Sequence, residues 1–224
     1  MDSKVVFIDH PYYAVNNPSN NLRIYKKNKN DEWYYIQCKN KDQYRKEIRK
    51  YILGFYDYSR DEKKSKTSMF DYYMGSKKSE DVMERNKMCR EEMAMLKDGT
   101  FIKDDMVEDM KNSWGNYLEN SNVNLAVLSL YQDYVDENIA IEDLQKEVAT
   151  KIMPKFLKYC GYQDPKKNLE WIVSLHCDRE NNYHFHIAWI EKNKCYKLKN
   201  NKLGHRHRLK LNENENNFIK RQVS

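Results

Sequence analysis

The sequence predicts an α+β fold: a single domain, residues 1–224, with a central antiparallel sheet flanked by helices. Three observations support this prediction. No segment rich in proline, glycine or serine divides the 224 residues, and this length suits one domain with a sizeable core. Stretches with strand-like and helix-like spacing of apolar residues follow one another along the chain. Two strand-like stretches near the C-terminus are joined by a short polar segment, which is typical of a hairpin.

The N-terminal part predicts two short strands and a helix. Residues 5–8 form an apolar run that His10 and Pro11 end, and the aromatic-rich residues 33–38 form a second strand candidate. From residue 41 to residue 52 apolar side chains recur at helical spacing, and a glycine follows where a helix would end.

The middle of the chain predicts an exposed excursion, two helices and a strand. Residues 55–78 mix charged and aromatic side chains without a regular period, so we expect them to leave the body of the domain. Helices are predicted over 79–97 and 103–120, and a strand over 123–131.

A long helix is predicted over residues 141–160. Pro154 lies inside it and should kink or interrupt it, because proline lacks the backbone donor that the helix needs. Gly161 should end it.

The two strands of the predicted hairpin are residues 171–177 and 183–191, and residues 178–182 have the polar composition of the connecting loop. Residues 192–224 read as a tail, first basic and then rich in asparagine and glutamate. It stops just as a helix could begin.

Composition narrows the classes of protein. The formal net charge of +6 suits a partner that carries phosphates. The five cysteines are scattered and form no CxxC pair, so we do not expect a disulfide framework. A reducing cytosol is the expected environment. We find neither a signal peptide nor an apolar stretch that could span a membrane, and expect a cytoplasmic protein without membrane insertion.

Three histidines carry the functional prediction. Side chains alternate along a strand, so His184 and His186 share one face while Phe185 and Ile187 take the other. On the preceding strand His176 can lie opposite this pair. Three imidazoles with open positions between them are typical of a catalytic metal site. The alternative is a polar hairpin that happens to carry histidines.

Other polar residues extend this prediction. Asp178 lies just past His176 and could orient an imidazole as a hydrogen-bond acceptor, or could be a solvated turn residue. His205 belongs to a second His-x-His pattern, but Arg206 and Arg208 would repel a cation there. We therefore interpret this segment as a loop that contacts phosphates.

The histidine segment resembles motif three of the relaxases of plasmids and conjugative elements, above all the MobL-type enzymes of the MobP class within the HUH endonuclease superfamily. The matching residues are Trp171, His176, Asp178, Asn182, His184, His186, Ile187 and Ala188. Three weaker similarities lie upstream, at residues 58–62 (YSRDE), 70–76 (FDYYMGS) and 99–101 (GTF). The resemblance covers roughly residues 45–195. The segment between the first and second histidines is one residue longer than in typical relatives.

The resemblance implies a mechanism. His176, His184 and His186 would hold a divalent cation, Mn²⁺ or Mg²⁺ first and Zn²⁺ as an alternative. A tyrosine hydroxyl would attack the DNA backbone and stay attached to the 5′ end as a phosphotyrosine intermediate. Tyr58 is the first candidate and Tyr56 the second.

Other tyrosines remain open as alternatives, because the chain has 18 and the pairs at 12–13 and 72–73 also lie near charged or turn residues. Arg60 is expected to contact a phosphate, or to pair with a neighbouring aspartate. Aromatic and basic residues alternate over 44–78, which suits single-stranded DNA, and the basic tail could add contacts.

The implied function is site- and strand-specific nicking and joining of single-stranded DNA in the bacterial cytoplasm. Such an enzyme initiates conjugative transfer or mobilisation of a plasmid or integrative element. Its partners would be DNA at an origin of transfer, accessory proteins of the relaxosome and a coupling protein. A rolling-circle replication initiator or transposase of the same superfamily is the first alternative, although a tyrosine that precedes the histidines favours a relaxase. A catalytically silent DNA-binding accessory protein is the second.

Overall fold

The computed structural model describes residues 5–9, 23–27, 33–37, 39, 43, 94–121, 123–131, 135, 139–179, 182–206 and 211–223. For residues 5–9, 23–27, 33–37, 176–179, 182 and 223 it describes the backbone only. Most of the helix predicted over 41–52, the excursion over 55–78 and the larger part of the helix predicted over 79–97 lie outside these residues.

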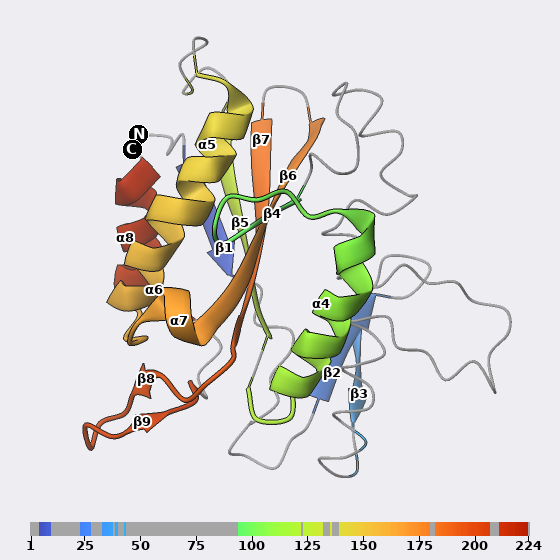
Figure 1. The fold of residues 1–224 in the computed structure, drawn as a ribbon, viewed down its shortest axis with the longest axis vertical. Helices are drawn as coiled ribbons and strands as arrows, with labels where there is room; N and C mark the ends of the chain where they lie inside the picture. Colours follow the sequence, from blue (N-terminus) through green and yellow to red (C-terminus); the bar gives the residue numbers. More distant parts are fainter. Residues whose placement is uncertain are drawn as a thin grey trace, which may run out of the picture.

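Within the described residues, the main sheet has five antiparallel strands in the order β1-β5-β7-β6-β4 (Figure 1). Their bounds are Val5–Asp9 for β1, Val123–Tyr131 for β5, Asn182–Glu191 for β7, Leu169–Arg179 for β6 and Ala94–Leu96 for β4. The two strands predicted as a hairpin lie at its centre. The predicted α+β fold with a central antiparallel sheet is confirmed.

In the part of the chain that the structure describes, four short strands lie outside the main sheet. Strands β2 (Arg23–Lys27) and β3 (Trp33–Gln37) pair with each other, as do β8 (Tyr196–Lys197) and β9 (Leu203–Gly204). The strand predicted over 33–38 is therefore confirmed, but it belongs to a separate ladder.

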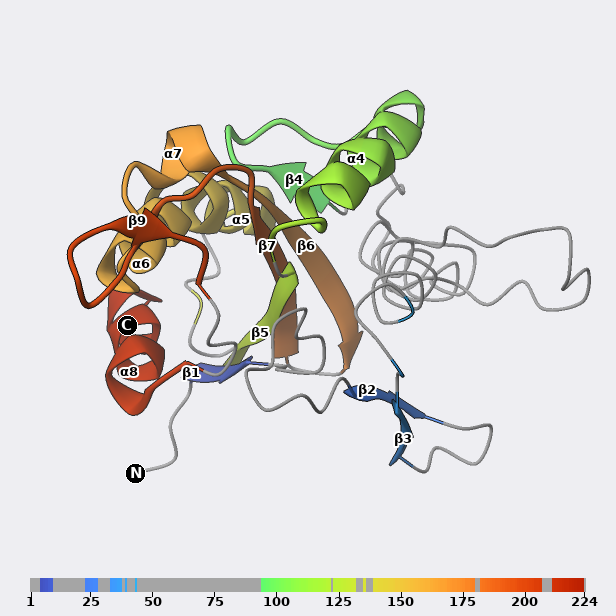
Figure 2. The same ribbon diagram turned by 90° about the horizontal axis from the view of Figure 1, so that it is seen from below.

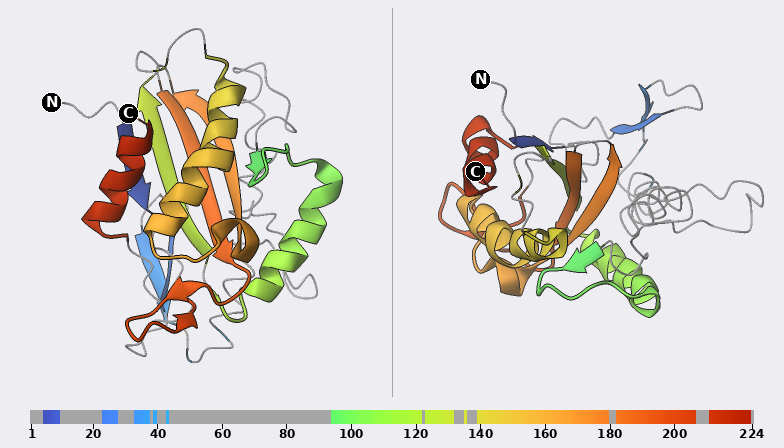
Figure 3. Two further views of the ribbon diagram at one scale, coloured as in Figure 1. Left: turned by 60° about the vertical axis from the view of Figure 1, so that its left-hand side comes forward. Right: turned by 90° about the horizontal axis from the view of Figure 1, so that it is seen from above.

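One face of the sheet forms the hydrophobic core with helices α5 (Ile141–Glu147) and α6 (Met153–Tyr159), which cross it (Figure 3). Every second residue of the central strands points into this core, as strand alternation requires. The strand members are Ala126, Leu128, Leu130, Trp171, Val173, Leu175, Phe185, Ile187 and Trp189, all at most 1% exposed. The opposite face is left for the histidines.

The helix predicted over 141–160 is present but is not α-helical throughout. A π-helical turn, η4 (Val148–Ile152), separates α5 from α6 and comes directly before Met153 and Pro154. Pro154 cannot donate to the carbonyl of Thr150, and its ring crowds that carbonyl, so the backbone widens there. The interruption predicted from Pro154 is confirmed, and it lies in the turn that precedes the proline.

Gly161 ends α6 as predicted. Its φ of +100° is the left-handed conformation that glycine adopts without a steric cost. The Tyr162 N–H donates to the Leu157 carbonyl at 3.1 Å and the Gly161 N–H donates to the Lys158 carbonyl at 3.0 Å. These two bonds make a Schellman motif, which satisfies carbonyls that the helix end would leave open.

The helix predicted over 79–97 is wrong at its end, because Ala94–Leu96 is strand β4. This segment pairs with β6, and Met95 is fully buried in the core, so pairing with an open sheet edge outweighs the helical propensity of these residues. A tight turn follows, in which the Gly99 N–H donates to the Leu96 carbonyl at 2.9 Å.

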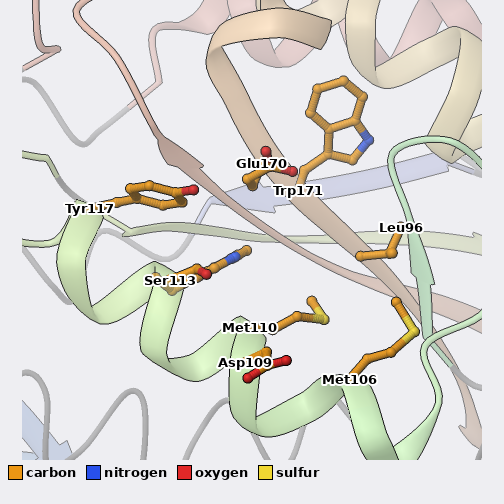
Figure 4. A pocket seen from close by; sticks show the side chains of 9 residues that line it. Leu96, Met106, Asp109, Met110, Ser113, Tyr117, Glu170 and Trp171 are labelled. Carbon is orange, nitrogen blue, oxygen red and sulfur yellow. The ribbon is translucent and has the colours of Figure 1, made fainter.

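Helix α4 (Asp104–Tyr117) confirms the helix predicted over 103–120 and lies beside the β6–β4 edge of the sheet (Figure 2). Side chains of α4 line a cavity of about 340 Å³ together with Leu96 and Glu170, while the Trp171 indole points away from α4 (Figure 4). Glu170 precedes His176 by six residues, about 20 Å along a strand. The cavity is therefore separate from the histidines.

The C-terminal residues are not a tail. Helix α8 (Glu213–Val223) packs against β1 and α6, with Ile219 fully buried in the core. A capping box starts the helix: Glu215 N–H donates to Asn212 Oδ1 at 2.9 Å, and Asn212 N–H donates to Glu215 Oε2 at 2.7 Å. The spacing Asn-x-x-Glu was the signal in the sequence. A short helix, α7 (Pro165–Asn168), precedes β6.

Within the described residues, no helix combines the length and the apolar character needed to cross a membrane.

Candidate functional site

The three predicted histidines lie on neighbouring strands at one end of the sheet. His176 of β6 is directly opposite His184 of β7, and His186 follows two residues along β7 on the same face. Directly opposed residues in an antiparallel pair have Cβ atoms about 4.5–5.5 Å apart. The strand register therefore brings the three positions together as the hairpin prediction expected.

His184 is held from its other side by β5. Ser129 lies directly opposite it, and the Ser129 hydroxyl is hydrogen bonded to His184 Nδ1 at 2.9 Å. The imidazole is only 8% exposed, and among the residues that the structure describes its Nε2 has no hydrogen-bond partner. A buried polar atom without a partner is costly, and a metal ion bound to Nε2 would satisfy it.

This face opens to solvent toward the β6–β7 turn. Along β5, Val127 and Ser129 are half-buried, and Tyr131 is 43% exposed. His186, opposite Val127 and Ser174, is half-buried as well. The far end of the same face is mostly apolar and buried: Leu125, Ile172 and Ala188 are at most 4% exposed, while Glu170 is half-buried. A substrate could therefore reach the histidines from the turn end of the sheet.

The β6–β7 ladder has a register shift beyond the histidines. His176 pairs with His184, but Arg179 pairs with Asn182, so β6 carries one more residue than β7 over this stretch. Such a β-bulge bends its strand and re-aims side chains, and bulges are frequent next to active sites. The bulge therefore lies between the paired histidines and the turn of the hairpin.

The donor set fits a divalent transition metal. His184 offers a buried ring nitrogen without a partner, while Ser129 occupies the other one, which is the arrangement of a metal-binding histidine. Among the side chains that the structure describes, no three His, Cys, Asp or Glu residues form a metal-binding group, and the His176 side chain is not one of those described.

Several predicted site residues lie outside the described part of the chain. These are the candidate nucleophiles Tyr58 and Tyr56 and the candidate phosphate contacts Arg60 and Arg208. Asp178 lies in β6 within the bulge, and the structure describes only its backbone.

Tyr131 was not anticipated from the sequence. It is the last residue of β5, two residues beyond Ser129 on the same face and about 7 Å further along the strand. It is 43% exposed and lies opposite Asn182, at the histidine end of the sheet. The alternation over 123–131, combined with the pairing of β5 and β7, would have found it.

The interpretation of Arg206 as a phosphate contact is wrong. Arg206 is 3% exposed, and its Nη2 lies 2.9 Å from Glu215 Oε2. Its guanidinium also lies over the rings of Tyr162 and Tyr196, at 5.9 and 5.5 Å from their centroids. Burial alone would lower the pKa of Arg206, but the neighbouring Tyr162 and Glu215 oxygens raise it above its usual value, so the side chain stays charged.

His205 also has a structural partner in place of a phosphate. Its Nδ1 lies 2.8 Å from Glu191 Oε2, and the other oxygen of this carboxylate accepts the Arg206 N–H at 2.7 Å. Glu191, at the end of β7, is 2% exposed. These contacts join the segment after β9 to the central strand.

Two further groups near Arg206 could be mistaken for nucleophiles. Burial raises the pKa of the Cys160 thiol to about 12 and raises the pKa of Tyr162 well above 10. Both groups therefore stay protonated at neutral pH. Neither is a candidate nucleophile.

We expect the substitution Arg206→Met to lower the free energy of unfolding by about 3–5 kcal/mol, because Glu215 would remain buried without its cation. Urea denaturation measures this. The matched control is Arg221→Met in the exposed last turn of α8, which should change stability by at most about 0.5 kcal/mol. A phosphate-contacting arginine would behave differently: Arg206→Met would leave stability unchanged and would reduce the salt dependence of DNA binding.

No protein-family model, no curated protein and no solved structure matches the chain. The geometry of the histidine face and the motifs in the sequence are therefore what support a functional proposal.

Proposed function

We propose that the chain is a metal-dependent enzyme that nicks and rejoins single-stranded DNA at a specific site and on a specific strand, through a 5′-phosphotyrosine intermediate. In this proposal it is a relaxase of the HUH endonuclease class, which initiates conjugative transfer or mobilisation of a plasmid or integrative element in the bacterial cytoplasm.

The observation that best supports this proposal is the arrangement around His184. Its ring is buried, one nitrogen is hydrogen bonded to Ser129, and the other has no partner, while His176 is opposite it in the neighbouring strand. An unsatisfied buried ring nitrogen costs about 1–3 kcal/mol, and a cation bound to this nitrogen would offset that cost.

In the proposed reaction, His176, His184 and His186 would hold the cation and Asp178 would help to orient an imidazole. A bound Mn²⁺ or Mg²⁺, or Zn²⁺, would polarise the scissile phosphate and offset its developing negative charge. The hydroxyl of Tyr58, or of Tyr56, attacks phosphorus in line. The new P–O bond joins tyrosine to the 5′ end, and the P–O3′ bond breaks. The phenol loses its proton, and the released 3′ oxygen takes up a proton to become a hydroxyl.

The DNA path in this proposal enters at the open, turn end of the histidine face. The aromatic and basic residues 44–78, with Arg60 among them, would bind bases by stacking and the backbone by charge. Arg206 is not part of this path, because it is buried in the ion pair with Glu215. Arg208 is retained as a candidate contact. Relaxosome accessory proteins and a coupling protein would be the protein partners.

The test uses single-stranded oligonucleotides that tile both strands of the genetic element encoding the protein. Incubation with the protein and Mn²⁺ should give, on one strand and at one position, a DNA–protein adduct that survives SDS. EDTA should abolish the adduct completely, and Mn²⁺ added back should restore it, because the metal supplies stabilisation that the protein alone lacks.

Mapping the adduct separates the alternatives. A relaxase leaves protein on the 5′ end and a free 3′ hydroxyl, and the cleaved position should fall at an origin of transfer. An adduct that maps to a replication origin or to transposon ends would instead indicate an initiator or transposase. Tight binding without an adduct on any strand would overturn the enzyme proposal and leave a DNA-binding accessory protein.

A further inference from the structure

The geometry points to Ser129 as a positioning residue for the metal site: its hydroxyl holds the His184 ring so that Nε2 is available to the cation. This inference rests on the proposed metal site. Ser129 lies 55 residues before His184 and is not part of the histidine motif, so the sequence alone does not connect the two residues. The two meet only because β5 pairs with β7.

The register places His184 between two partners. On one side Ser129 of β5 is directly opposite, and on the other side His176 of β6 is directly opposite. Ser129 is bonded to Nδ1 at 2.9 Å, which leaves Nε2 as the nitrogen for a ligand. One neighbouring strand therefore orients the imidazole, and the other supplies a second candidate ligand.

A serine hydroxyl suits this position because it can accept or donate a hydrogen bond. When it accepts from the Nδ1 proton, the lone pair of the neutral imidazole is on Nε2, where a metal can bind. Histidines that bind metals almost always donate their other ring N–H in this way, and the bond fixes both the tautomer and the ring orientation. The hydroxyl does so without adding charge beside the cation.

The core side of β5 supports this arrangement. Leu128 and Leu130, on either side of Ser129, are buried at 0% and 1% exposure under the helices. Packing of these two side chains fixes the backbone of β5, so the Ser129 hydroxyl has little freedom to move away from His184. A residue on such a rigid element can position a ligand more accurately than one on a loop.

The experiment measures Mn²⁺ affinity of the whole protein by the electron paramagnetic resonance signal of free Mn²⁺. We expect Ser129→Ala to weaken Mn²⁺ binding by about 10–100-fold, as loss of such an orienting bond does in metal sites. Ser129→Thr keeps the hydroxyl and should restore most of the affinity. His184→Ala should remove binding at this site.

The matched control is Ser121→Ala. Ser121 precedes β5, is 1% exposed, and its hydroxyl accepts the Glu191 N–H at 3.1 Å at the far end of β7. Its removal should lower the midpoint of thermal unfolding and leave Mn²⁺ affinity unchanged.

Three outcomes would overturn the inference: unchanged Mn²⁺ affinity in Ser129→Ala, an equal loss of affinity in Ser121→Ala, or no recovery in Ser129→Thr. If the unaltered protein binds no Mn²⁺, the metal site itself is wrong. If no DNA strand forms an adduct but Ser129→Ala still weakens Mn²⁺ binding, the nicking proposal fails and the inference about Ser129 stands.

Discussion

Replacing His184 with alanine is expected to abolish nicking. We expect the rate to fall by about a thousandfold or more, because Lewis-acid stabilisation is worth several kcal/mol and each 1.4 kcal/mol is a factor of about ten. The measurement is the initial rate of adduct formation with Mn²⁺ on the cleaved oligonucleotide, together with Mn²⁺ affinity.

The fold should tolerate this change better than most losses of a buried side chain. His184 has one ring nitrogen without a partner, and its removal takes away an unsatisfied polar atom along with the bond to Ser129. A large loss of activity should therefore accompany a small change in the midpoint of urea unfolding. Binding of single-stranded DNA should be retained, because it depends mainly on contacts outside the metal site.

The control for the His184 variant is His205→Gln. His205 lies after β9 and is paired with Glu191, at the end of β7 away from His184. It should leave Mn²⁺ affinity and nicking unchanged. If His184→Ala nicks at the normal rate while the protein remains folded, the histidine face is not the catalytic centre.

The substitution Tyr58→Phe is expected to remove the covalent adduct completely while leaving Mn²⁺ affinity and DNA binding intact. Phenylalanine keeps the ring for packing or stacking and lacks only the attacking oxygen, so the loss isolates the nucleophile. A tyrosine with an ordinary pKa near 10 is about 0.1% ionised at pH 7, and the nearby cation would favour its phenolate form.

Two further tyrosine variants test whether Tyr58 is the nucleophile. Tyr56→Phe should retain the adduct if Tyr58 is the nucleophile, and an adduct lost only in Tyr56→Phe would reverse the assignment. Tyr131→Phe is the structural comparison, because this exposed tyrosine lies on the histidine face of β5. Loss of the adduct in Tyr131→Phe alone would show that a tyrosine on the sheet carries out the attack.

The central part of the fold could be predicted because local patterns there agree with the tertiary environment. Strands β5, β6 and β7 alternate cleanly, with one face in the core, and their boundaries fall within a few residues of the predictions. The same alternation predicted that His184 and His186 share a face. Sequence spacing could not show that Ser129 would lie opposite His184, since that depends on which strands pair.

The errors occurred where long-range packing decides the local structure. Ala94–Leu96 has residues that suit a helix, but the open edge of β6 pairs with it. Arg206 belongs to a basic segment that looks solvent-exposed, yet Glu215, nine residues further on, buries it in an ion pair. The partner of a charged side chain is a property of the folded chain, and a run of charges in the sequence does not reveal it.

The contact between α8 and β1 affects how the protein folds during and after its synthesis. The strand that contains residues 5–9 needs β5, more than a hundred residues later, and helix α8, which also contacts it, is made later still. As the chain leaves the ribosome, β1 is synthesised long before its partners, and the core stays incomplete until Ile219 emerges. Contacts between such distant parts slow folding, so we expect a slow final phase of refolding that reports the docking of α8.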